Sequence, residues 1–201
     1  NNGGYDLLSD HAVGKNVLTV AAVEDIAAGY NPLNGPTQVV MSSFSSFGPP
    51  DDGRIKPDVV GPGTHVVGTA SPVAGYDGTG VCNQYYPPSQ TIYNWSSGTS
   101  HSAPALAGFT SLIANYLKRE HGFGDMRTAT GPSPALIKAY LTHSNRILSG
   151  GVGTSGLIMP SNNQGWGFPN GNDAFNNTVT RFIRDQQTVI GESGDGPIYV
   201  G

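Results

Sequence analysis

The apolar and polar positions follow one pattern before Ser100 and a different one after it. Before Ser100, apolar residues form short continuous runs rich in β-branched side chains, which is typical of strands buried on both faces of a parallel sheet. Such runs predict strands at residues 16–23, 38–43, 58–60 and 64–69, separated by turns rich in Gly and Pro. The polar stretch over residues 71–89 shows no clear period, so we interpret it as a loop.

After Ser100 the apolar residues recur every three or four positions, as on one face of a helix. Lys118 and Arg119 suit the last turn of this helix, and Gly122 can end it. Many of its positions are Ala, Gly or Ser, so we expect it to pack closely on its neighbours and to be largely buried. Ser133 as N-cap and Pro134 as first residue predict a second helix.

Composition describes a domain that has enough apolar side chains for a core but carries little charge. Hydrophobic residues make up 37% of the 201 positions, whereas charged residues make up only 12%. With 29 Gly and 15 Pro, this composition favours a rigid, loop-rich and secreted protein. The net charge of −4 and the lack of a basic run argue against nucleic acid or an anionic membrane as partner. No apolar run approaches the roughly 20 residues of a membrane span.

The sharpest chemical feature is residues 98–104, GTSHSAP, at the start of the first helix. A serine hydroxyl becomes a good nucleophile only when a base removes its proton. At a helix N-terminus, free N–H groups and the positive end of the dipole also favour a developing oxyanion. An ordinary Ser or Thr helix cap is the alternative interpretation of this motif taken alone.

This motif resembles the nucleophile motif of the subtilisin-like serine proteases, the subtilase family, and three further blocks agree in order. Residues 15–22 (KNVLTVAA) resemble the strand that precedes the nucleophile, and residues 163–167 (NQGWG) resemble the segment that closes the catalytic domain. The third block joins residues 44–49 (FSSFGP) with residues 52–63 (DGRIKPDVVGPG). The resemblance implies an α/β, three-layer subtilisin-like fold with a mostly parallel sheet, of which this chain is a part.

The resemblance also implies roles for individual residues. Ser100 would be the nucleophile that attacks the scissile carbonyl and forms an acyl-enzyme. Asn1 would be the oxyanion-hole asparagine, although residues 1–4 (NNGG) can also be interpreted as a plain turn. Residues 9–12 fall where the family lines its primary specificity pocket.

A subtilase triad runs Asp, His, Ser along the chain, and the Asp and His motifs are not found before Ser100. His101 follows the nucleophile directly, where many family members have Met, and on a helix its side chain points about a hundred degrees away. We therefore expect His101 to pack behind Ser100 and not to act as its base. The other four histidines do not replace the missing base either, because they lie near predicted strands or helix ends.

These expectations lead to one functional hypothesis. The chain is a serine endopeptidase portion, inactive alone, whose substrate is a polypeptide and whose partner is an upstream fragment of the same protein carrying the catalytic Asp and His. Residues 1–176 would belong to the catalytic domain, and residues 177–201 to a linker and the start of a β-sandwich-like domain. The alternative is a non-catalytic subtilase-like module for peptide binding or structure. An α/β-hydrolase esterase does not fit, because Ser102 stands where its motif requires Gly.

The chemistry requires no cofactor, and a structural calcium ion is an additional expectation. Oxygen-rich loops at residues 51–52 and 170–176 could supply its ligands, although their spacing is not that of an EF-hand. The single cysteine, Cys82, excludes an internal disulfide and a Cys-rich zinc site.

Overall fold

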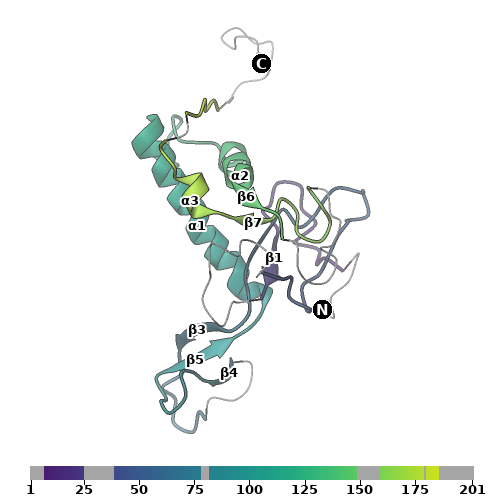
Figure 1. The fold of residues 1–201 in the computed structure, drawn as a ribbon, viewed down its shortest axis with the longest axis vertical. Helices are drawn as coiled ribbons and strands as arrows, with labels where there is room; N and C mark the ends of the chain where they lie inside the picture. Colours follow the sequence, from purple (N-terminus) through teal and green to yellow (C-terminus); the bar gives the residue numbers. More distant parts are fainter. Residues whose placement is uncertain (1–6, 25–38, 78–81, 149–158, 179, 186–201) are drawn as a thin grey trace.

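A computed structural model describes residues 7–24, 39–77, 82–148, 159–178 and 180–185. The expected β-rich segment beyond residue 185 lies outside them. The longest element is a helix of 23 residues, α1 (Thr99–His121), which runs along one side of the molecule (Figure 1). The other elements are β1 (Val20–Val23), β2 (Val59–Pro62), β3 (Val66–Thr69), β4 (Cys82–Tyr85), β5 (Tyr93–Ser96), α2 (Pro134–His143), β6 (Asn145–Arg146), β7 (Phe168–Pro169) and α3 (Gly171–Ala174).

The centre of the fold is a parallel pair of buried strands covered by α1. β1 and β2 pair in parallel from Val20↔Val59 to Val23↔Pro62, and three of the four residues in each strand are buried. This confirms the prediction that continuous apolar runs form strands buried on both faces. In the described part of the predicted strand at residues 38–43, Val40 and Met41 form isolated bridges only, and that of Met41 is antiparallel to Val23.

α1 confirms the predicted helix and its end. The N–H of Gly122, in the left-handed conformation at φ +74°, donates to the carbonyl of Leu117. Leu106, Ile113 and Leu117 are buried in the core shared with α2. The expectation that α1 is largely buried is wrong for the part of the chain that the structure describes, because its outer face is open and Leu112 is 56% exposed. Small residues permit close packing on this face, but no described element covers it.

The polar stretch interpreted as a loop contains β4, and β5 follows it, so that prediction is wrong. β3, β5 and β4 form an antiparallel sheet at the end of α1 where the helix begins (Figure 1). In β5 the polar side chains of Asn94 and Ser96 are buried, whereas Tyr93 is exposed. The burial pattern is therefore the reverse of the hydrophobic alternation by which a half-buried strand is detected in a sequence.

α2 begins as the sequence predicts and joins the core next to α1. The hydroxyl of Ser133 accepts a hydrogen bond from the N–H of Leu136 (3.0 Å) and donates to the carboxylate of Asp185 (2.6 Å). Tyr140 is buried, and its hydroxyl donates to the carbonyl of Ala174 at 2.7 Å. Burial raises the pKa of Tyr140 to about 12, so this donor keeps its proton at neutral pH.

We expect Ser133→Ala to lower the free energy of unfolding by about 1 kcal/mol, the usual cost of losing an N-cap. The helix loses its only side-chain acceptor at the first turn, and Asp185 loses a donor. Thr142→Ala is the matched control, because Thr142 is a half-buried residue of α2 whose hydroxyl donates only to the local carbonyl of Ala139. Urea denaturation measures both. Equal midpoints for the two variants would contradict the capping role.

Candidate functional site

Ser100 lies in the first turn of α1 and is exposed to solvent. A tight turn connects β5 to it, with Gly98 at φ +158°, a conformation that L side chains rarely adopt. The N–H of Gly98 donates to the carbonyl of Gly63 at 2.7 Å, and its own carbonyl accepts from the N–H of His101 at 3.0 Å. The turn is thus fixed to the end of β2 on one side and to α1 on the other.

The N-terminus of α1 carries no side-chain cap. Its N-cap residue is Gly98, which has no side chain to accept from the first-turn N–H groups. An N-terminal turn without a cap leaves N–H donors next to Ser100, at the positive end of a 23-residue helix. This arrangement can stabilise negative charge that develops on an oxygen beside the Ser100 hydroxyl.

A cavity of about 290 Å³ opens beside Ser100. Ser9 and Ala12 form part of its wall. That this cavity is the primary specificity pocket expected at residues 9–12 stays a prediction. The sequence interpretation missed the opposite wall, which the FSSFGP block and the turn before β2 supply. None of the described lining residues is charged: Leu8, Ser9, Ala12, Thr19, Val20, Ala21, Phe44, Ser45, Ser46, Pro57, Gly98, Thr99 and Ser100.

A second hollow, of about 340 Å³, adjoins the first beside Ser100. It shares Ser9, Ala12 and Ser100 with the first cavity and extends to Ala103 on the open face of α1. His11 also lines it. The segment that contains Ala12 therefore lines both hollows, and Ser100 borders both of them.

The five histidines are all described, and none of them forms a hydrogen bond with Ser100. His101 Nε2 lies 2.8 Å from the buried hydroxyl of Ser96, so His101 joins the start of α1 to the end of β5. The rings of His65, His121 and His143 pack against Trp95, Tyr116 and Tyr140, and His11 faces solvent at the second hollow. The described residues thus contain no general base positioned for Ser100.

Two other expectations have different outcomes. Asn1 lies outside the described residues, so its place relative to Ser100 stays a prediction. In the loops considered for calcium, the carboxylate of Asp52 pairs with Arg54 at 2.6 Å, and the side chain of Asn170 caps α3. In the described part of the chain, no three acidic, His or Cys side chains gather as a metal site would require. Calcium binding stays a prediction.

We expect Gly63→Ala to displace Ser100 and to lower activity. A Cβ at residue 63 would lie within 3.0 Å of the Ser102 hydroxyl and of the Ala22 Cβ, both in buried positions without room to move. Overpacking of this kind usually costs about 1–3 kcal/mol. Here it would also push the start of α1 away from β2. In the protein that carries its upstream segment, the urea midpoint of unfolding and the rate of serine labelling should both fall. Gly68→Ala, with nothing within 4 Å of the added atom, should change neither.

Comparison with known proteins identifies the family to which this arrangement belongs. A family model described as the Subtilase family matches residues 1–167. The chain belongs to the subtilase family. A serine protease/ABC transporter B family protein, tagB, of Dictyostelium discoideum is 32% identical over 113 residues, 55% of this chain and 6% of that protein. The serine protease AprX of Bacillus subtilis is 31% identical over 118 residues, 56% of this chain and 24% of that protein.

A solved structure supports the same assignment at the level of the fold. The CspB protease of Clostridium perfringens superposes with a TM-score of 0.55 at 23% identity, covering 89% of this chain and 30% of that chain. The predicted α/β subtilisin-like fold is thus confirmed. The chain spans less than a third of the length of each of these relatives. None of the described helices is long and apolar enough to cross a bilayer.

Proposed function

We propose that this subtilase chain supplies the nucleophile and part of the substrate site of a secreted serine endopeptidase. The observation that carries the proposal is the exposed Ser100 at the uncapped start of α1, where it lines two adjoining hollows. The hydroxyl attacks the scissile carbonyl, the C–N bond breaks, and the amine leaves with a proton from the general acid. Water then hydrolyses the acyl-enzyme and restores Ser100.

The oxyanion receives two kinds of donor in this proposal. The first is the backbone N–H of Ser100, at the helix end that lacks a side-chain cap. The second is the side-chain amide of Asn1, which the family motif places at this point. In a subtilisin, loss of one such side-chain donor costs about 2.7–4 kcal/mol of transition-state stabilisation.

The histidine base and its aspartate belong to an upstream segment in this proposal. A base must come within about 2.6–3.2 Å of the Ser100 hydroxyl. The second hollow is lined by Ser100, Ala103 and Val20, so we assign the approach of the base to this hollow. It continues onto the open face of α1, where small residues permit another helix to pack closely. We assign this face to the upstream segment.

The substrate is an extended polypeptide whose acyl side enters the first cavity. Because the described wall consists of apolar and hydroxyl side chains, the cavity favours an uncharged substrate side chain. A charged side chain would lose its hydration there without gaining an ion pair.

A fluorophosphonate probe tests the proposal on the protein that carries its upstream segment. We expect a covalent adduct, and peptide mass spectrometry should place it on Ser100. An adduct on another serine, or none although the upstream segment is present and the protein is folded, would contradict the proposal and favour a non-catalytic peptide-binding module. The 201-residue chain alone should give no adduct, because it lacks the base.

A further inference from the structure

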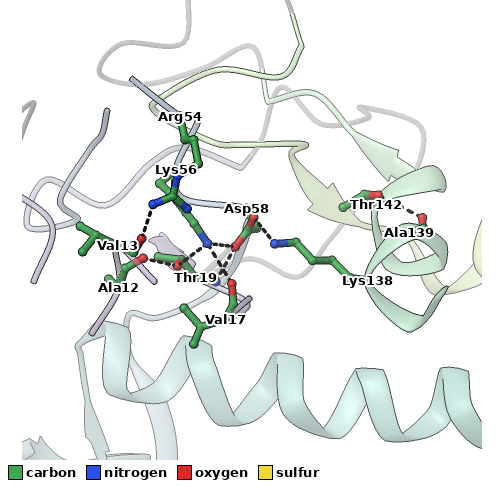
Figure 2. A network of polar contacts seen from close by, with 10 residues as sticks. All are labelled: Ala12, Val13, Val17, Thr19, Arg54, Lys56, Asp58, Lys138, Ala139 and Thr142. Atoms are coloured by element: carbon green, nitrogen blue, oxygen red, sulfur yellow. Dashed lines mark hydrogen bonds and ion pairs between the residues drawn. The ribbon is translucent and has the colours of Figure 1, made fainter. Parts of the chain in front are cut away.

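Lys56 is a buried cation whose ammonium group is enclosed by oxygen atoms. Only 2% of its side chain is exposed. Its ammonium donates to the carbonyl of Val17 (2.8 Å), the hydroxyl of Thr19 (3.1 Å) and the carboxylate of Asp58 (2.7 Å) (Figure 2). An ammonium group has three N–H donors, so these three contacts satisfy all of them.

The same carboxylate is shared by a second lysine. Asp58 Oδ2 accepts from Lys56 and from the backbone N–H of Thr19 at 2.7 Å, whereas Oδ1 pairs with Lys138 of α2 at 2.6 Å. Figure 2 shows the two lysines reaching Asp58 from opposite sides. Lys138 is partly exposed and forms no hydrogen bond or ion pair with residues 12–19, so it serves as an internal reference for Lys56.

The Lys56 contacts lead to the wall of the cavity. The hydroxyl of Thr19 accepts from Lys56 and donates to the carbonyl of Ala12 at 2.6 Å. Ala12 and Thr19 line both hollows beside Ser100. Arg54 adds a hydrogen bond to the carbonyl of Val13 at 2.7 Å. Side chains from the turn before β2 thus hold the backbone between Ala12 and Thr19 at several carbonyl oxygens.

Stability alone is a weak reason for this arrangement. Well-packed apolar side chains in place of a buried ion pair are often neutral or stabilising. A cation held by three oxygens, however, fixes the position of each oxygen, which an apolar side chain does not. The segment that it fixes is the one that lines both hollows beside Ser100.

We propose that Lys56 is a positioning residue for substrate binding. Through Val17 and Thr19 it fixes the Ala12 wall at the distance from Ser100 that a substrate side chain requires. The proposal rests on the peptidase function proposed above. It predicts that loss of Lys56 weakens substrate binding and leaves the reactivity of Ser100 unchanged, because no contact of Lys56 involves the turn at Gly98 or the start of α1.

Lys56→Met in the protein with its upstream segment tests this inference. We expect KM for the best substrate of an internally quenched peptide library to rise about tenfold, the equivalent of roughly one good hydrogen bond. Both kcat and the rate of labelling by a small fluorophosphonate, which leaves the cavity empty, should stay within about twofold. Lys138→Met should leave KM within about twofold, because it affects the same carboxylate without reaching the wall.

Thr19→Val is the second variant, and it decides the matter if Lys56→Met does not fold. It removes the hydroxyl between Lys56 and Ala12 and leaves the Lys56–Asp58 pair in place, so it should also raise KM. Unchanged KM in Thr19→Val, or equal KM increases in Lys56→Met and Lys138→Met, would overturn the inference. An absence of labelling in the unmodified protein would instead overturn the proposed function itself.

Discussion

Ser100→Ala should reduce kcat/KM for a peptide substrate by at least about 10⁴-fold in the protein that carries the upstream segment. Without the hydroxyl no acyl-enzyme forms, and only binding and oxyanion stabilisation remain. In a subtilisin, removal of the nucleophile lowers kcat by about 2 × 10⁶-fold, so the loss expected here lies within what is measured in the same family. The quenched-peptide assay measures the loss, and covalent labelling by the fluorophosphonate probe should disappear with it.

The same substitution should leave the fold intact. Ser100 is exposed, and the N-cap of α1 is Gly98, so alanine removes no described capping bond. We expect the free energy of unfolding to change by less than about 0.5 kcal/mol. Ser111→Ala is the matched control, because Ser111 is an exposed serine of the same helix that bonds only to the local carbonyl of Ala107. It should keep full activity. A Ser100→Ala protein that retains activity would exclude Ser100 as the nucleophile.

The parts of the fold that the sequence predicts are those determined by local chemistry. α2 needs only Ser133 and Pro134 to define its start, and α1 needs only Gly122 to define its end, because helix caps act within one turn. β1 and β2 are continuous apolar runs, and burial on both faces makes such runs detectable. In these elements, sequence spacing alone is sufficient.

The parts that the sequence does not predict depend on distant partners. β5 buries Asn94 and Ser96, and these residues gain partners from Tyr76 and His101 that no local pattern reveals. The open face of α1 has the small residues of a packed helix, so composition predicted burial where the described chain provides no covering element. The pattern of small residues shows that a helix face is able to pack closely. Whether that face is buried depends on a second element that lies elsewhere in the sequence.

The candidate site divides in the same way. Ser100 and the wall at residues 9–12 could be identified from family motifs, because each lies within a few residues of a recognisable block. The opposite wall of the cavity, at Phe44 and Pro57, comes from segments that lie 25 or more residues after residues 9–12 in the sequence. In the motif that contains Lys56 and Asp58, charged residues beside an apolar run would ordinarily suggest an exposed turn. Only the structure shows that Lys56 is buried and bonded to the opposite segment.

Asp58→Asn should therefore be the most destabilising of the proposed substitutions, lowering the free energy of unfolding by about 3–5 kcal/mol. The asparagine keeps the shape of the side chain but removes the charge, so the buried Lys56 is left without an anion. Lys138 loses its partner at the same time. Urea denaturation followed by tryptophan fluorescence measures the loss.

A matched control and a double variant separate the effect of charge from that of shape. Asp173→Asn removes a carboxylate paired with Arg146 at 3.1 Å, and since both side chains are more than a third exposed, it should cost at most about 1 kcal/mol.

The double variant Lys56→Met/Asp58→Leu removes the buried cation together with its anion, so it should be more stable than Asp58→Asn alone. A double variant that is less stable would show that the hydrogen bonds to Val17 and Thr19, and not the compensation of charge, are the larger contribution. Since the proposed positioning role of Lys56 requires those hydrogen bonds, the double variant should still show a raised KM even where its stability recovers.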